Sequence, residues 1–332
     1  MKKAAAFLLL FFLLFSFVAC SPAEKTARGF SMGSDYYVTY RSKGDFDSEI
    51  ADLLSSVEEG FSLKVEGSLT ARINAADAGE VLSLTSEEVW LLSDVFELAT
   101  VSDCAFNPAI LPLVKTWGFD PPYEMNGQVP PLEESIQAAK ALSSTSLFYL
   151  NTSLNSIVKS KSSAALDLGA AIKGYAANRV ADFLLQVKGV SEALVYIGGT
   201  IAAVGRAYEI GVTPPRDSDE SYAFRFRLEE GKICATSGDY ERYYMYNGTR
   251  YHHILDSHTG YPAASGVISA TVVHSNGLVA DALATAVVVL GAEKGRALLE
   301  RCGASGAIVT SDKKIVTCNL NVTVKDTSYE IA

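Results

Sequence analysis

The sequence of 332 residues lacks the glycine-rich motifs that identify the common nucleotide-binding folds. It contains neither a GxGxxG turn nor a Walker loop, which disfavours the usual dinucleotide and P-loop sites. Clusters of basic residues are absent as well, and the net charge is −10. An acidic chain of this kind is a poor nucleic-acid binder. A polyanionic ligand would therefore need local help from a metal ion or from backbone dipoles.

Cysteine is scarce and irregularly spaced. Four of the five cysteines lie beyond the first twenty residues, and none of them belongs to a CxxC pair. This spacing disfavours a cysteine-based metal site, so we expect small buried apolar residues instead. One disulfide remains compatible with an oxidising compartment. The four residues are Cys104, Cys234, Cys302 and Cys318.

A long apolar run opens the chain. Residues 4–18 follow two lysines, and the run is too short for a comfortable transmembrane helix but typical of an export signal. Phe17-Val18-Ala19-Cys20 then resembles a bacterial lipobox, with Phe17 where leucine is usual. We therefore expect a lipoprotein signal peptide over residues 1–19, a lipid on Cys20 and a polar tether over residues 20–29. An ordinary signal peptide is the alternative, and the lipoprotein would be periplasmic and anchored to the inner membrane.

Hydrophobic periodicity predicts a mixture of helices and short strands. No internal repeat and no domain boundary is evident, so residues 30–326 are expected to form one α+β domain in which antiparallel sheets pack with helices. The predicted helices cover residues 47–61, 85–101, 132–142, 172–187, 278–290 and 292–302. The predicted strands cover residues 35–41, 193–197, 200–204, 208–212, 223–228, 233–235, 243–246, 251–255, 307–310, 315–317 and 322–324, with a hairpin over 148–159.

Local signals refine these boundaries. Asp47 is the predicted N-cap of the first helix, and Thr85-Ser86-Glu87-Glu88 has the pattern of a capping box. The polar stretch 62–79 predicts a loop. A further strand is expected to end at Leu168.

Small hydroxyl residues and glycines surround three of the four histidines between residues 235 and 281. Thr236-Ser237-Gly238 is predicted as a turn after a strand, whose backbone N–H groups can face an anion. His253, on a neighbouring strand, can add a polar or cationic group. Asp281 and Thr285, four residues apart on a predicted helix, offer on one face the hard oxygen ligands that Mg²⁺ takes beside phosphates. Together these residues indicate a site for a phosphorylated ligand with a divalent metal.

A second set of polar residues lies near the predicted helix start at Ile172. The small residues before it permit close approach of a phosphate or a ribose. Lys173 could then reach an anion, and Asp167 could accept a hydrogen bond from a sugar or an amine. A plain strand-to-helix turn with a solvated lysine is the alternative, and these residues alone do not decide between the two.

Residues 104–120 combine aromatic side chains with two prolines, which bar a continuous helix. Phe106, Trp117 and Phe119 are candidates to line a pocket for a planar ring. A buried connecting loop is the alternative, and this stretch taken alone favours it.

Eight short motifs follow one another between Phe30 and Thr317. They are Met32-Gly33-Ser34, Phe106-Asn107-Pro108, Trp117-Gly118-Phe119, Leu166-Asp167-Leu168-Gly169 with Lys173-Gly174-Tyr175, Gly198-Gly199, Thr236-Ser237-Gly238, His253-Ile254-Leu255-Asp256 with Thr259-Gly260-Tyr261-Pro262, and Asp281-Ala282-Leu283-Ala284-Thr285-Ala286. Each is weak alone, but eight in this order are specific. They resemble the ApbE family of FAD:protein FMN transferases, also called flavin-trafficking lipoproteins, in its treponemal type. The resemblance implies an ApbE-like fold, which is T-fold-like in its antiparallel sheets.

The resemblance implies a metal-dependent transfer of FMN. A Thr or Ser hydroxyl of an exported acceptor protein attacks the FMN-side phosphorus of FAD, AMP leaves, and FMN stays attached through a phosphoester. A metal that bridges phosphate oxygens offsets the developing charge. The implied partners are therefore FAD, an acceptor protein with a Thr or Ser site, and the membrane through a lipid on Cys20, but no nucleic acid.

The resemblance also carries roles to individual residues of this chain. It implies that Asp281, Thr285 and a backbone oxygen of the Ala170–Ala171 turn hold Mg²⁺, with Mn²⁺ as the alternative. His253 would orient or deprotonate the incoming hydroxyl and would act with Asp281 and Thr285 as a catalytic residue. The residues implied to bind FAD are Met32, Asn74, Phe106, Trp117, Asp167, Lys173, Thr236, Ser237, Gly238 and His253.

Two residues depart from the family pattern. Asn107 stands where many members carry Asp, which removes a charge. Asn74 stands where many members carry an aromatic residue, which would leave the site more open to water. Water attacking the same phosphorus would give FMN and AMP, so FAD pyrophosphatase activity is expected as a second function.

Three other functions remain compatible with parts of the sequence. His252, His253 and His258 are enough in number for a zinc site, although neighbouring residues on a strand point to opposite faces. A non-enzymatic flavin-storage lipoprotein would use the same pocket without the metal, and the two predicted metal ligands on one helix argue against it. A flavinylated acceptor is suggested by Ser305-Gly306-Ala307, but its place between two apolar stretches favours a buried strand.

Overall fold

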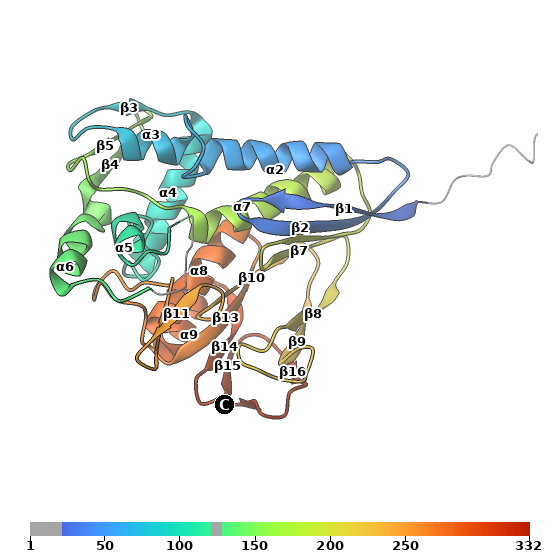
Figure 1. Ribbon diagram of the computed structural model, residues 1–332. Coiled ribbons are helices and arrows are strands. Elements are labelled where there is room, and N and C mark those ends of the chain that lie inside the picture. The colour runs from blue at the N-terminus through green and yellow to red at the C-terminus, as the bar shows by residue number, and fades with distance from the viewer. Residues whose placement is uncertain (1–21, 121–127) are drawn as a thin grey trace, which may run out of the picture.

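The computed structural model describes residues 22–120 and 128–332 (Figure 1). The predicted signal peptide over residues 1–19 and the predicted acylation site at Cys20 lie outside the described residues. Within these two ranges, no helix is both long enough and apolar enough to span a membrane. Residues 23–29, which the sequence predicts as part of a tether, belong to the first strand of the main sheet.

A sheet of nine strands runs through the described chain in the order β1-β2-β6-β7-β10-β13-β14-β15-β17. Neighbouring strands are antiparallel except for β15 and β17, which are parallel. The prediction of an α+β fold with antiparallel sheets is confirmed. The strands are β1 (Ala23–Ser31), β2 (Ser34–Ser42), β6 (Ala193–Ile197), β7 (Thr200–Val204), β10 (Ile233–Gly238), β13 (Val267–His274), β14 (Ser305–Thr310), β15 (Lys314–Cys318) and β17 (Glu330–Ile331).

Each face of the main sheet buries its own hydrophobic core. Successive residues of a strand point to opposite faces, so Ala235 packs with the helices while Cys234 packs with a second sheet. Val272 and Val273 divide in the same way. The second sheet is made of β16 (Val322–Val324), β9 (Phe224–Leu228) and β8 (Tyr208–Val212). The four cysteines of the described chain are free thiols, two of them buried.

Helices cover the face of the main sheet to which Ala235 and Val272 point, and α7 and α8 pack against each other on that face (Figure 1). The helices are α2 (Asp47–Phe61), α3 (Leu69–Ala75), α4 (Ser86–Val101), α5 (Leu111–Thr116), α6 (Glu133–Leu142), α7 (Gly169–Asp182), α8 (Gly277–Leu290) and α9 (Ala292–Arg301), with the short turns η1 (Thr145–Leu147) and η2 (Phe183–Val187). The remaining strands are β3 (Leu82–Ser83), β4 (Phe148–Asn151) and β5 (Ser156–Lys159) in one small sheet, and β11 (Tyr243–Tyr246) and β12 (Thr249–His252) in a hairpin.

One helix start follows the sequence signal and another does not. The Thr85 hydroxyl accepts the N–H of Glu88, and the Glu88 carboxylate accepts the N–H of Thr85, which confirms the capping box. At α2 the N-cap position falls on Phe46, so the prediction for Asp47 is wrong. The Asp47 carboxylate instead accepts the hydroxyl of Tyr40 at 2.8 Å, because that buried ring offers a donor beside it.

Two segments differ from their predictions. The stretch 62–79 is not a continuous loop, because it contains α3, which Ser68 caps by accepting the N–H of Ala71 at 3.1 Å. No strand ends at Leu168, and α7 begins at Gly169 rather than near the predicted start. The start of α3 depends on a hydrogen bond to the Ser68 side chain, which hydrophobic periodicity does not register.

Candidate functional site

Two glycines allow α7 and α8 to touch at the backbone. A Cβ on Gly174 would lie 1.9 Å from the carbonyl oxygen of Gly277, and a Cβ on Gly277 would lie 2.3 Å from that of Gly174. Any side chain would therefore force the two helices apart. The side-chain oxygen of Asn178 also accepts the N–H of Gly277. This crossing brings the first turns of α7 against the residues of α8 that are predicted to bind a metal.

Asp281 points from α8 at the first turns of α7. Its Oδ2 accepts the N–H of Gly174 at 3.0 Å, and its side chain is buried. In a regular helix this N–H donates to the carbonyl of Ala170, so Asp281 reaches a backbone donor in the second turn of α7. Burial raises the pKa of the Asp281 carboxyl, while Lys173 and the Gly174 N–H oppose that shift.

Thr285 lies one turn after Asp281 on α8 and contacts the end of β10. The hydroxyls of Thr285 and Ser237 are 3.2 Å apart. The predicted pair of oxygen groups on one helix face therefore meets a third hydroxyl, which comes from the main sheet. A carboxylate and hydroxyls are oxygen donors of the kind that Mg²⁺ accepts.

The turn predicted at residues 236–238 is wrong, because these residues continue β10 in register with β13. The Thr236 N–H donates to the carbonyl of Gly199 at 3.2 Å, and the Thr236 hydroxyl lies 2.9 Å from that of Thr271. Gly238 pairs with Ser269. The segment is thus held as a strand, and it presents the Ser237 side chain to α8.

Asp167 and Lys173 lie at the start of α7, as predicted. Oδ1 of Asp167 accepts the N–H of Gly169 at 2.8 Å, and Nζ of Lys173 donates to the Gly169 carbonyl at 3.3 Å. Burial raises the pKa of Asp167, whereas the Gly169 N–H and the charges of Arg242 and Lys173 lower it. The Lys173 charge therefore acts directly on the Asp167 carboxylate.

His253 follows β12 and lies beside Arg242. Its backbone N–H donates to the Arg242 carbonyl at 3.0 Å, and its Nδ1 lies 3.3 Å from the same oxygen. Burial lowers the pKa of His253 well below its usual range, and the positive charges of Arg242 and His252 add to the effect. The imidazole is therefore neutral at pH 7. Because a carbonyl can only accept, the proton lies on Nδ1 and Nε2 is left as an acceptor.

Glu241 and Arg242, between β10 and β11, belong to the same cluster and were not predicted from the sequence. Desolvation raises the pKa of Glu241, with Lys173 and Arg242 opposing and the negative charge of Asp281 adding to the rise. Arg242 also acts on Asp167. The sequence signal that indicates these two residues is their position as adjacent opposite charges between Thr236-Ser237-Gly238 and His252-His253.

Met32 occupies the turn between β1 and β2, as predicted. Met32 and Gly33 have φ values of 50° and 73°, the geometry of a tight hairpin turn. The Met32 N–H donates to Glu58 at 3.0 Å, which fixes the turn. A Cβ built on Gly198 would meet both Ser34 and the stem of Lys173. This turn therefore lies beside the Lys173 side of the cluster.

The side chains of Asn74 and Asn107 both hydrogen-bond to backbone groups. Nδ2 of Asn74 donates to the Leu166 carbonyl at 2.9 Å, and its Oδ1 accepts the Leu166 N–H at 2.7 Å. These bonds fix the orientation of the Asn74 side chain, and its contact with a ring of FAD stays a prediction. Asn107 donates to the Ser143 carbonyl at 3.0 Å and accepts the N–H of Ala109 at 2.8 Å.

The aromatic residues of segment 104–120 are core residues. Phe106, Trp117 and Phe119 are each no more than 2% exposed. Nε1 of Trp117 donates to the Gly260 carbonyl at 2.8 Å, and its ring stacks on Tyr251 with 5.5 Å between centroids. The prediction that Phe106 and Trp117 contact a ligand ring is wrong, and the alternative of a buried connection is confirmed.

The histidines do not form a zinc site. Nε2 of His252 lies 3.0 Å from the Ala263 carbonyl, and Nε2 of His258 lies 2.6 Å from that of Asp103. In the part of the chain that the structure describes, no three His, Cys, Asp or Glu residues are grouped so that they could hold a metal. A metal at the α7–α8 crossing would instead take one carboxylate together with hydroxyl and backbone oxygens.

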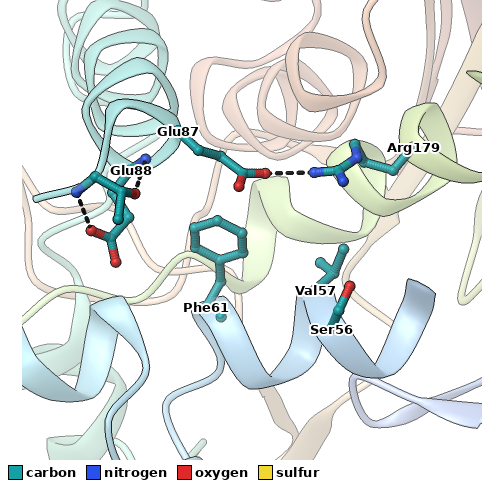
Figure 2. A pocket seen from close by; sticks show the side chains of 8 residues that line it. Ser56, Val57, Phe61, Glu87, Glu88 and Arg179 are labelled. Carbon is teal, nitrogen blue, oxygen red and sulfur yellow. Dashed lines mark hydrogen bonds and ion pairs between the residues drawn. The ribbon is translucent and has the colours of Figure 1, made fainter. Parts of the chain in front are cut away.

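A hollow bordered by α2, α4 and α7 lies apart from this cluster (Figure 2). The Glu87 carboxylate on α4 pairs with Arg179 on α7, and Phe61 of α2 lies near that pair. The predicted site residues do not line it. One helix, α7, thus reaches the candidate site with its first turns and the hollow with its last turn.

Both the sequence and the fold of this chain are similar to those of known proteins. Residues 32–309 match the ApbE family. The chain belongs to the ApbE family. It is 32% identical over 292 residues to a Vibrio cholerae protein named FAD:protein FMN transferase, covering 84% of this chain and 85% of that protein. A Treponema pallidum protein of the same name is 31% identical, covering 80% and 77%.

A solved ApbE structure has the same fold. The apo crystal structure of the Pseudomonas stutzeri flavinyl transferase ApbE matches this chain with a TM-score of 0.76 and 30% identity, covering 93% of this chain and 96% of that one. The family resemblance that the eight motifs indicated is confirmed.

Proposed function

We propose that this ApbE family member is a metal-dependent FAD:protein FMN transferase. It attaches FMN through a phosphoester to a Thr or Ser of an exported acceptor protein and releases AMP. The observation that carries the proposal is the contact of Asp281 with the N–H of Gly174 in α7, one helical turn from Thr285, whose hydroxyl lies beside that of Ser237 in β10. The names of the Vibrio and Treponema relatives support the same activity.

The proposed metal ligands are hard oxygen donors, which suit Mg²⁺ or Mn²⁺. They are the Asp281 carboxylate, the Thr285 hydroxyl and a backbone oxygen at Ala171, and the Gly174 N–H holds the carboxylate in place. When bound, the metal would offset the charge that develops on the phosphate oxygens. Lys173, in the first turns of α7, would bind an oxygen of the same diphosphate. Its aliphatic stem packs beside Gly198, in the turn between β6 and β7.

His253 is the proposed general base. Its ring is neutral, and Nδ1–H faces the Arg242 carbonyl, so Nε2 can take the proton of the incoming hydroxyl. The carbonyl fixes the tautomer and the ring orientation. Arg242 and Lys173 keep the surroundings of His253 positive, which favours an anionic substrate.

Hydrolysis of FAD to FMN and AMP is proposed as a second activity. Nε2 of His253 can take a proton from water as well as from a Thr or Ser hydroxyl. The amide of Asn74 bonds to the backbone of Leu166, and the greater access for water at this small residue stays a prediction. Which nucleophile reacts then depends on whether an acceptor hydroxyl occupies the position next to His253.

The proposed place of action is the periplasm, with the chain anchored to the inner membrane through a lipid on Cys20. An export signal is needed to meet exported acceptors. Lipid labelling of the wild type and of Cys20→Ala tests the anchor, and equal labelling of the two proteins would contradict it.

The activity is tested by incubation with FAD and Mg²⁺, with and without a peptide that carries a Thr or Ser acceptor site. We expect AMP in both cases, free FMN without the peptide, and a peptide heavier by one FMN phosphoester when it is present. A chelator should stop AMP release. Tight FAD binding without any AMP would instead support the flavin-storage alternative.

A further inference from the structure

A buried lysine lies behind the site. Lys159, at the end of β5, is 2% exposed. Its ammonium donates to the carbonyl of Asn74 at 2.7 Å and to that of Ala164 at 3.1 Å. Burial lowers the pKa of Lys159, and the negative charges of Asp77 and Glu80 oppose that shift. These two bonds join the end of α3 to the segment before α7. Because burying a charged lysine costs free energy, an apolar side chain would fill the same space at a lower cost.

The side chain of Asn74 continues this connection toward the site. Its amide bonds both backbone groups of Leu166, in the way that a neighbouring strand would. The next N–H, of Asp167, donates to the Pro108 carbonyl at 2.7 Å. Hydrogen bonds therefore hold three consecutive parts of this region: Lys159 bonds to Asn74, Asn74 bonds to Leu166, and the next residue, Asp167, bonds to Pro108.

These bonds fix the register of residues 164–168. Ala164, Leu166 and Leu168 are buried, while Ala165 and Asp167 between them are only partly buried. In an extended segment a slip of one residue would exchange these two sets of positions, which would turn the Asp167 carboxylate into the core and expose the leucines. The same slip would move Oδ1 of Asp167 away from the first N–H of α7, which it accepts.

We propose that Lys159 and Asn74 are positioning residues for the transfer reaction, which hold residues 164–168 in the register that presents Asp167 to FAD. The inference rests on the proposed function, because Asp167 is assigned to FAD through it. Neither positioning residue touches the reacting atoms. Asn74 would thus act in FAD binding through the position of Asp167.

The first test is Lys159→Met, which keeps the length of the side chain and removes the ammonium. The KM for FAD should rise about tenfold while kcat at saturating FAD stays nearly unchanged. The reason is that Asp167 would bind FAD equally in the ground state and in the transition state. The matched control is Lys161→Met, two residues later and exposed, which should leave KM unchanged.

The second test is Asn74→Leu, which removes the bonds to Leu166 while the main-chain carbonyl that Lys159 contacts remains. It should raise KM in the same way. The double variant should show a rise in KM smaller than the product of the two single effects, because both residues hold one segment. Amide hydrogen exchange at Leu166 and Asp167 should be faster in each variant than in Lys161→Met.

The outcomes separate the possibilities. A lower melting temperature with an unchanged KM for FAD would assign the two residues to packing and overturn the proposal, as would full additivity in the double variant. If the wild type neither binds FAD nor releases AMP, the proposed function fails. In that case the exchange rates decide whether the hydrogen bonds hold the segment at all.

Discussion

The α7–α8 crossing and the segment at residues 104–120 are both built from family motifs, yet they serve different ends. At the crossing, backbone touches backbone and a buried carboxylate faces a helix start. In the segment, Phe106 and Trp117 fill the core, and the Trp117 N–H is engaged by the Gly260 carbonyl. A motif residue can therefore be required for the shape of the domain without contacting a ligand. Substitutions should separate the two kinds.

The largest effect is expected from Gly174→Ala. The new Cβ would lie 1.9 Å from the Gly277 carbonyl oxygen, so the helices must separate and Asp281 must lose its N–H partner. We expect a loss of about 3 kcal/mol in unfolding free energy and no AMP release. Denaturant unfolding and an AMP assay measure the two effects.

The control for this variant is Gly60→Ala. Gly60 lies in α2, and a Cβ there would meet no atom within 4 Å. This variant should gain about 0.5–1 kcal/mol, because alanine favours a helix more than glycine does. Equal stability of the two variants would show that the backbone contact does not fix the crossing.

The next largest effect is on turnover alone, in Asp281→Asn. The amide can still accept the Gly174 N–H, but the charge is lost. AMP release should fall about 1000-fold, or about 4 kcal/mol of transition-state stabilisation, while FAD binding and stability are retained. Fluorescence titration with FAD beside the AMP assay provides the comparison. Turnover near that of the wild type would remove Asp281 from the metal site.

Trp117→Phe should give the reverse pattern. It leaves the buried Gly260 carbonyl without its donor and should cost about 2 kcal/mol of stability, with an unchanged KM for FAD. Trp90→Phe is the control, because Trp90 is 48% exposed and should change stability by less than about 0.5 kcal/mol. A raised KM in Trp117→Phe alone would return this ring to the ligand site.

The smallest effect is a pH dependence at the site. The pKa of His253 is lowered from 6.5 on folding, chiefly by burial, so below that pH the unfolded chain binds a proton that the folded chain resists. Unfolding free energy should therefore fall as pH drops below 6.5, and less steeply in His253→Gln. Unfolding curves at about pH 8 and about pH 5.5 test this. Parallel pH profiles for the two proteins would contradict it.

Local signals predicted part of this arrangement. Asp281 and Thr285 are four residues apart, so their shared helix face follows from helix geometry once the apolar pattern predicts α8. The capping box at Thr85 is equally local. Antiparallel sheets packed with helices followed from the run of short strands and from the family motifs, and the strand order did not.

The rest depends on partners far apart in the chain. Asn74 meets Leu166 across 92 residues, and Trp117 meets Gly260 across 143. Hydrophobic periodicity predicts whether a side chain faces the core, but it does not predict which distant polar group that side chain hydrogen-bonds. The sequence therefore does not predict the bonds of Asn74 to Leu166 or the hydrogen bond of the Trp117 ring to Gly260.

The early start of β1 has a consequence for the proposed lipid anchor at Cys20. Ala23 is only three positions after Cys20, and extended chain covers at most about 11 Å over that distance. With the proposed lipid on Cys20, the folded domain would be confined to a thin layer at the bilayer surface. Such confinement raises the effective concentration for acceptors held in the same layer. A Thr or Ser displayed far above the membrane would then be out of reach, however well its local sequence suits the site.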